Sequence, residues 1–132
     1  MNFNDKLSIL LVEDNDLNQR LMKISLTRYH YIVTIAVNGL EGVQMFKNQK
    51  FDLILMDIMM PVMDGFEATK EIRNLEKKDA SLGHTPIIAF TANTINNDRE
   101  KCVNGGMDDI IEKPFDINKF REILSSLPEK NN

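Results

Sequence analysis

The sequence predicts a doubly wound α/β sandwich, in which helices cover both faces of a parallel β-sheet. Five short apolar runs alternate along the 132 residues with segments whose apolar side chains recur at helical spacing. The runs at 7–12 (LSILLV) and 51–56 (FDLILM) are nearly continuous in apolar residues, which is typical of strands covered on both faces. Alternating strands and helices imply right-handed crossovers. We therefore expect one layered domain at 5–128, with flexible ends at 1–4 and 129–132.

Each element follows from local sequence pattern, taken in chain order. Strands are expected at 7–12, 32–37, 51–56, 86–90 and 107–111. Helices are expected between and after them, because apolar residues recur three or four positions apart. The apolar faces of four amphipathic helices are expected to hold Leu17, Leu21 and Ile24; Leu40, Val43 and Phe46; Ala68, Ile72 and Leu75; and Ile117, Phe120, Leu124 and Leu127.

The remaining predicted helix, at 94–104, is the weakest, because it contains few apolar side chains. We expect it to be the most mobile helix. Asn38 and Asp64 are each followed three residues later by a glutamate, which resembles a capping box and predicts helix starts. Gly83 and the pair at 105–106 are expected helix stops.

Composition excludes several classes of protein. The chain has 16 Lys and Arg against 20 Asp and Glu, a net charge of −4, and 42% hydrophobic residues, which is typical of a soluble globular domain. The absence of a basic stripe argues against nucleic-acid binding, and no apolar run approaches the ~18 residues of a membrane span. The single cysteine, Cys102, cannot form an intrachain disulfide, so we expect a cytoplasmic protein.

Polar side chains follow the predicted strands where parallel strands end. Glu13 and Asp14 follow the first strand and Asp57 the third, while Thr91 and Lys113 follow the fourth and fifth. Ligands bind beyond the carboxyl ends of the strands in an open parallel sheet, so we expect these side chains to form one site. Three carboxylates in a partly desolvated cleft repel one another unless a cation or a lysine neutralises them.

These residue types predict phosphoryl chemistry with a magnesium ion. An oxygen-only donor set without His or Cys points to Mg²⁺ before Zn²⁺, and Mg²⁺ usually keeps waters that a phosphate oxygen can replace. Asp57 can then act as a nucleophile toward phosphorus. Lys113 and the metal would take up charge on the transferring group, and the Thr91 hydroxyl would donate to another oxygen.

Other candidate groups have ordinary structural interpretations. Four aspartates fit turn or cap positions: Asp16, Asp52, Asp64 and Asp116. Four methionines are better explained as packing residues than as a metal site: Met56, Met59, Met60 and Met63. His30 and His84 fall in predicted loops with no nucleophile beside them, so a histidine-based triad has little support.

Four segments resemble the motifs of the response-regulator receiver domain. They are LLVEDN at 10–15, LMDIMMPVMDGFE at 55–67, AFTAN at 89–93 and EKPF at 112–115, and together they extend over nearly the whole chain. The ordered combination is highly specific. The resemblance implies a flavodoxin-like (βα)5 fold with parallel strand order 2-1-3-4-5. The phrase VEDNDLNQRLM is more similar to receivers of hybrid histidine kinases than to chemotaxis or transcription-factor receivers.

The resemblance also implies a role for each site residue. By similarity Asp57 is the phosphoacceptor, and Glu13 and Asp14 hold Mg²⁺ directly or through water. The further implied groups are the backbone carbonyl of Met59 as a metal ligand, Thr91 as the switch hydroxyl and Lys113 as the phosphate-contacting lysine. One position departs from the family: Ile110 stands where receivers commonly carry Tyr, Phe or His as a second switch residue. This departure concerns the output mechanism rather than the chemistry.

The implied function is a signalling module rather than an enzyme. Asp57 would take a phosphoryl group from a phosphohistidine on a sensor histidine kinase or a histidine phosphotransfer protein, and the phosphorylated form would alter binding to a partner. We expect a monomer or weak dimer, either a stand-alone receiver or a segment of a hybrid kinase. One alternative is a Mg²⁺-dependent phosphohydrolase with an aspartyl phosphate, but such enzymes typically carry a second Asp where Met59 stands. A degenerate receiver used only for binding would lack one of the motif residues, and none is missing.

Overall fold

Strands and helices alternate along the chain in the computed structural model, which describes residues 6–92 and 98–128. The strands are β1 (Ser8–Val12), β2 (Ile32–Ala36), β3 (Leu53–Asp57), β4 (Ile87–Thr91) and β5 (Asp109–Glu112). The helices are α1 (Asp16–Thr27), α2 (Gly39–Asn48), α3 (Gly65–Lys78), α4 (Asp98–Asn104) and α5 (Ile117–Ser126), with a short 3-10 turn η1 (Ala80–Leu82) after α3. Residues 94–97 of the fourth expected helix, and the ends expected to be flexible, lie outside the described residues.

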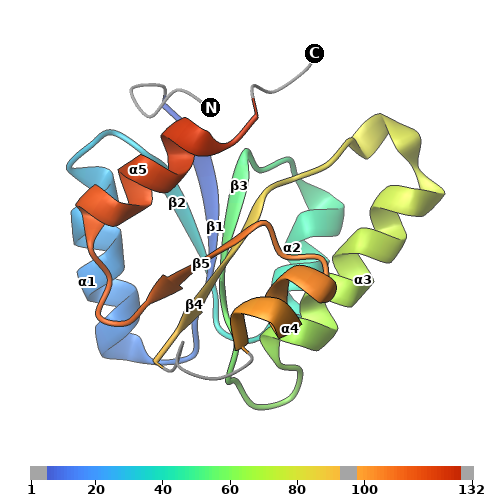
Figure 1. The fold of residues 1–132 in the computed structure, drawn as a ribbon, viewed down its shortest axis with the longest axis horizontal. Helices are drawn as coiled ribbons and strands as arrows, with labels where there is room; N and C mark the ends of the chain where they lie inside the picture. The colour runs from blue at the N-terminus through green and yellow to red at the C-terminus, as the bar shows by residue number, and fades with distance from the viewer. Residues whose placement is uncertain (1–5, 93–97, 129–132) are drawn as a thin grey trace.

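The strands form one parallel sheet in the order β2-β1-β3-β4-β5, which confirms the predicted doubly wound fold (Figure 1). Val12 at the end of β1 pairs with Met56, and the next residue of β3, Asp57, pairs with Phe90 of β4. Thr91 follows Phe90 and pairs with Glu112 of β5. This register brings the carboxyl ends of four strands to one edge of the sheet.

Two apolar layers lie on the two faces of the sheet. On one face α1 and α5 pack through Met22, Leu26, Phe120 and Leu124. On the other face α2, α3 and α4 contribute core residues that include Val43, Phe46, Ala68, Ile72 and Cys102. Figure 1 shows α1 and α5 on one side of the strands and α2 and α3 on the other. Burial on both faces explains why β1 and β3 are almost continuously apolar.

The predicted apolar face of α1 is wrong, although the helix itself is confirmed. Leu17, Leu21 and Ile24 are 63%, 54% and 55% exposed, whereas Met22 and Leu26 are buried. The helix carries two apolar stripes, and helical periodicity by itself does not say which stripe meets the sheet. An exposed stripe of large apolar side chains therefore remains on α1.

Most predicted boundaries and caps are confirmed to within two residues. The side chains of Asn38 and Asp64 accept hydrogen bonds from the backbone N–H of the glutamates three residues later, at 2.8 and 2.9 Å. The fifth strand begins at Asp109 rather than 107. The reason is that the Met107 N–H donates to the Cys102 carbonyl, at 2.9 Å, and so closes the end of α4 instead of joining the sheet.

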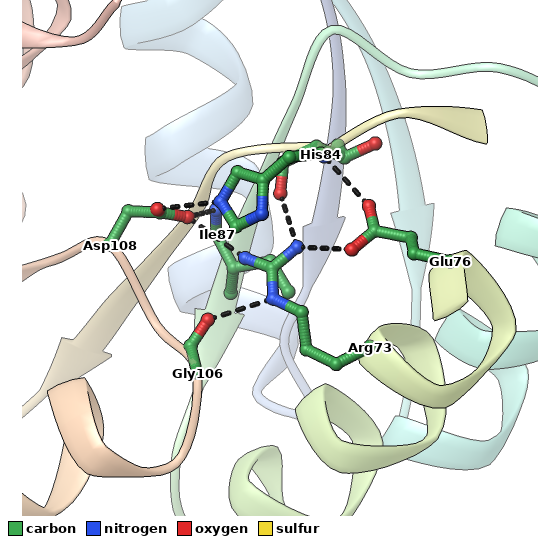
Figure 2. A network of polar contacts seen from close by, with 7 residues as sticks. Arg73, Glu76, His84, Ile87, Gly106 and Asp108 are labelled. Carbon is green, nitrogen blue, oxygen red and sulfur yellow. Dashed lines mark hydrogen bonds and ion pairs between the residues drawn. The ribbon is translucent and has the colours of Figure 1, made fainter. Parts of the chain in front are cut away.

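A polar network joins α3 to the amino ends of β4 and β5, at the edge opposite the carboxyl ends (Figure 2). The guanidinium of Arg73 pairs with Glu76 at 2.6 Å and with Asp108 at 2.9 Å, and it donates to the carbonyls of Gly106 and Thr85. Asp108 also accepts from the Ile87 N–H and contacts His84. This network fixes the segment between α4 and β5 against α3.

Among residues 6–92 and 98–128, no helix has both the length and the apolar character that crossing a membrane requires.

Candidate functional site

The structure gathers the predicted polar residues at the carboxyl edge of the sheet. Glu13 and Asp14 follow β1, Asp57 ends β3, Thr91 ends β4 and Lys113 follows β5. Carboxylate oxygens of Glu13, Asp14 and Asp57 all lie within 4.8 Å of one another. The distant parts of the sequence therefore meet because the parallel strands share one edge.

Two of these three carboxylates are withdrawn from water. Glu13 is fully buried and Asp57 is 3% exposed, whereas Asp14 is exposed. Burial, together with hydrogen bonding and charge from the adjacent Glu13, raises the pKa of Asp57 from 3.8 to about 7. A buried carboxylate beside another resists ionisation, because the charged form loses hydration and gains repulsion.

Lys113 supplies positive charge next to both buried acids. Its Nζ lies 3.3 Å from Oδ1 of Asp57 and 3.6 Å from Oε1 of Glu13. This ammonium lowers the pKa of Asp57 but does not cancel the effects of burial and of Glu13. Lys113 also lies over the ring of Phe90, with 5.1 Å from Nζ to the ring centroid, which limits where the ammonium can go.

The donor set fits a divalent cation with oxygen ligands. Oε2 of Glu13 is buried and receives no hydrogen bond within the described part of the chain. An ionised oxygen without a donor is expensive to bury, so it favours a positive ligand. Three carboxylates facing one lysine leave negative charge that a hard cation such as Mg²⁺ can balance.

The loop between β3 and α3 is held close to Asp57. The Gly65 N–H donates to the Ile58 carbonyl at 2.9 Å, and a Cβ at Gly65 would stand 2.3 Å from the Asp57 carbonyl oxygen. Only glycine therefore allows α3 to begin against the backbone of Asp57. Met59 lies on this loop with 77% of its surface exposed, so its prediction as a packing residue is wrong. Its carbonyl as a metal ligand stays a prediction.

Two site residues were missed in the sequence, and both lie in the first turns of α1. Nδ2 of Asn18 donates to Oε1 of Glu13 at 2.6 Å, and Nε2 of Gln19 donates to the backbone carbonyl of Glu13 at 2.6 Å. The sequence alone gave no signal for Asn18, because it shares a face with Met22 and Leu26 that helical periodicity did not identify as the buried one. A polar residue on a buried helix face requires a partner.

Of the four aspartates predicted as turn or cap residues, Asp64 and Asp116 are confirmed as helix caps, whereas Asp16 and Asp52 have other contacts. Asp64 and Asp116 cap α3 and α5, and Asp52 accepts from the Ser8 N–H at 2.8 Å. Asp16 is the first residue of α1, whose cap is Asn15. None of these groups takes part in the carboxylate cluster.

The chain is similar to one protein family and to solved structures with the same fold. A family model described as "Response regulator receiver domain" matches residues 9–125. Hybrid signal transduction histidine kinase B of Dictyostelium discoideum is 42% identical over 130 residues, which are 93% of this chain and 6% of that protein. The chain thus spans only a small part of this relative, as it does of "Transcription factor SKN7" of Candida albicans, at 40% identity, 92% of this chain and 21% of that protein.

Solved structures that share both the fold and appreciable identity include two with informative descriptions. One is the receiver domain of a sensor histidine kinase from Pseudomonas aeruginosa PAO1, described with a magnesium ion in its active-site cleft. It has a TM-score of 0.80 and 40% identity, over 92% of this chain and 96% of that one. The other is the Saccharomyces cerevisiae co-crystal structure of a histidine phosphotransfer signalling protein with the receiver domain of its downstream response regulator. It matches with a TM-score of 0.82 and 32% identity, over 91% of this chain and 87% of that one.

Proposed function

This chain belongs to the response-regulator receiver domain family of two-component signalling, and we propose that it acts by accepting a phosphoryl group on Asp57. The observation that carries the proposal is the placement of Asp57, a buried acid with two further carboxylates on one side and the Lys113 ammonium 3.3 Å away. A site of this kind can neutralise a phosphoryl group while one carboxylate oxygen bonds to phosphorus.

The proposed step transfers phosphorus from nitrogen to oxygen. An ionised Asp57 oxygen attacks the phosphorus of a phosphohistidine, and the P–N bond breaks as the P–O bond forms. The imidazole keeps the electron pair of the broken bond and leaves as a neutral ring, because its other nitrogen carries the proton. Lys113 would balance charge on the phosphoryl oxygens, and the hydroxyl of Thr91, which ends β4, would donate to one of them.

Glu13, Asp14 and Asp57 would hold Mg²⁺, with the Met59 carbonyl as a further ligand. The cation would supply charge stabilisation to the transferring group and favour the ionised form of Asp57, whose pKa is otherwise about 7. Support comes from the buried Oε2 of Glu13, which receives no hydrogen bond from the residues that the structure describes, and from the magnesium described in the related Pseudomonas receiver.

The proposed phosphoryl donor is a phosphohistidine on a kinase or a phosphotransfer protein. It must reach a buried acid, so it has to cover the surface around the carboxyl edge. The exposed stripe of Leu17, Leu21 and Ile24 on α1 begins three residues after Asp14 and offers apolar area at that place. The related yeast receiver, in complex with a histidine phosphotransfer protein, is consistent with a partner of this class.

Phosphorylation with two donors tests the acceptor and the docking surface separately. Wild-type protein with Mg²⁺ and a small acyl phosphate should form an acid-stable, base-labile aspartyl phosphate, and Asp57→Asn should form none. Leu21→Asp should slow transfer from a phosphohistidine protein while leaving the small donor unaffected. Ile32→Asp is the matched control, because Ile32 is equally exposed, at 58%, but begins β2 at the opposite edge. Labelling of Asp57→Asn would refute the acceptor.

The residues that the structure describes include no feature that favours the phosphohydrolase alternative. It calls for a second acid two residues beyond the nucleophile, and the exposed Met59 occupies that position. We therefore infer that the chain catalyses only its own phosphorylation and dephosphorylation.

A further inference from the structure

Asn18 makes a contact with the site that neither a helix cap nor the apolar core requires. Its Nδ2 lies 2.6 Å from Oε1 of Glu13, the fully buried carboxylate. The N-cap of α1 is already provided by Asn15, whose side chain accepts from the Asn18 N–H at 2.9 Å. The side-chain amide of Asn18 is therefore free to serve Glu13.

The two oxygens of Glu13 have different environments. Oε1 receives the Asn18 amide and lies 3.6 Å from Nζ of Lys113, while Oε2 is buried and receives no hydrogen bond within the described residues. The Glu13 carboxylate is thus held through Oε1, and Oε2 is available to a cation. Glutamate has three side-chain torsions, and a donor on one oxygen restricts its rotation.

We propose that Asn18 is a positioning residue of the cation site, which holds Oε1 of Glu13 so that Oε2 remains the oxygen offered to Mg²⁺. The inference rests on the proposed function, since it takes Glu13, Asp14 and Asp57 to be the cation ligands. A second consequence concerns Lys113. Because Asn18 partly satisfies Glu13, the ammonium can stay closer to Asp57, at 3.3 Å, than to Glu13.

Loss of the Asn18 amide should weaken Mg²⁺ binding by roughly tenfold, which is the lower end of the effect of removing a group that orients a metal ligand. The expected cause is twofold. Glu13 would gain rotational freedom, and it would draw Lys113 toward itself in place of the missing donor. The metal-free variant should also melt at a lower temperature than wild type, because a buried oxygen of Glu13 loses its donor.

Gln19 provides a matched control in the same turn of the helix. It also donates a side-chain hydrogen bond of 2.6 Å to Glu13, but to the backbone carbonyl rather than the carboxylate. Asn18→Ala and Gln19→Ala therefore each remove one amide and one hydrogen bond to the same residue. Only the first should alter how the carboxylate is held.

The test is a titration of the full chain with MgCl₂ at constant ionic strength, followed by NMR chemical shifts, with the melting temperature of each metal-free variant recorded in parallel. Asn18→Ala should raise the dissociation constant about tenfold and Gln19→Ala less than twofold. In a Glu13→Asp background, whose side chain is one methylene shorter, Asn18→Ala should have no further effect. Asn18→Leu repeats the test if the alanine variant does not fold.

The outcomes separate this inference from the function on which it rests. Equal affinity in wild type and Asn18→Ala, or an equal loss in Gln19→Ala, overturns the positioning role and leaves the proposed function intact. An undiminished effect of Asn18→Ala in the Glu13→Asp background also overturns it, because the amide would then act on another group. A wild-type protein that binds no Mg²⁺ overturns both.

Discussion

Nζ of Lys113 lies 3.3 Å from Oδ1 of Asp57, a carboxylate that exposes only 3% of its surface. The Lys113 ammonium lowers the pKa of Asp57, whereas desolvation and the neighbouring Glu13 raise it. The balance between these effects determines how much of Asp57 is ionised at neutral pH when no cation is bound.

Lys113→Met should raise the pKa of Asp57 above its value of about 7, because it removes the neighbouring positive charge. Phosphorylation by a small acyl phosphate at pH 7 should slow by at least tenfold, through both the smaller ionised fraction and the lost contact with phosphate. Measuring the rate across pH tests this, with the midpoint expected to move upward. An unchanged rate and midpoint would remove Lys113 from the site.

Asp57→Asn should stabilise the Mg²⁺-free protein at pH 8, and much less at pH 5. The pKa of Asp57 is raised from 3.8 to about 7 on folding. The folded chain therefore binds more protons than the unfolded chain between these values, so stability falls as pH rises through that window. The effect is at most roughly a few kcal/mol.

Urea unfolding of both proteins at the two pH values, with a chelator present, measures this difference. Mg²⁺ should restore wild-type stability at pH 8, because it binds only the folded site. If wild type and variant lose stability equally between pH 5 and pH 8, Asp57 is not the group responsible.

Met59→Asn should speed loss of the aspartyl phosphate at least severalfold when no kinase is present. Met59 lies two residues after Asp57 and is 77% exposed, so a polar side chain there could orient an attacking water that methionine cannot. Val62→Asn is the control, since Val62 is equally exposed on the same loop but three residues farther on. Asn93, two residues after Thr91, is also expected to flank the phosphoryl group, but it lies outside the described residues. Equal decay in wild type and Met59→Asn would contradict this role.

Thr91→Ala should erase most of the structural response to phosphorylation, whereas Ile110→Val should spare it. Thr91 ends β4 at the site, while Ile110 lies in β5, is 9% exposed and packs in the core beside Cys102 and Met107. A β-branched core side chain is stiff at χ1. It therefore provides little differential contact to shift an equilibrium.

Amide exchange of the free protein and of its Mg²⁺ complex with a phosphoryl mimic would measure the response, which we expect over α4, β5 and α5. The reverse ranking of the two variants would show that position 110 is a switch after all.

Arg73→Met should destabilise the protein by about 2 kcal/mol, because it removes charge-assisted hydrogen bonds to Glu76, whose side chain is 7% exposed, and to the more exposed Asp108. Its side chain is 13% exposed and joins Glu76, Asp108 and two backbone carbonyls (Figure 2). Phosphorylation of Asp57 in the folded variant should be unchanged, since the network lies at the opposite edge of the sheet. Arg20→Met, which breaks an exposed pair with Asp16, should change stability by less than about 0.5 kcal/mol. Urea unfolding of both variants measures these changes in stability. Similar losses of stability in Arg73→Met and Arg20→Met would contradict the prediction.

The sequence predicted where the helices and strands lie better than it predicted which side chains are buried or contact one another. Helix positions and the caps at Asn38 and Asp64 were predicted because each depends on local spacing, whereas the strand order was implied by the resemblance to the receiver family. The buried face of α1 was not predicted, since Leu17 and Met22 belong to two stripes of similar apolar character. The partnership of Arg73 with Asp108, 35 residues apart, also gave no local signal.

The sequence by itself determined the alternation of strands and helices, and it placed acids, a threonine and a lysine where parallel strands end. These features depend on residue type and on near neighbours along the chain. Only the tertiary structure decided that Asn18 holds Glu13, that Oε2 of Glu13 has no donor among the described residues, and that the pKa of Asp57 rises to about 7. Desolvation and charge act through space, over a few ångströms between segments far apart in sequence, so they exist only once the sheet has brought those segments together.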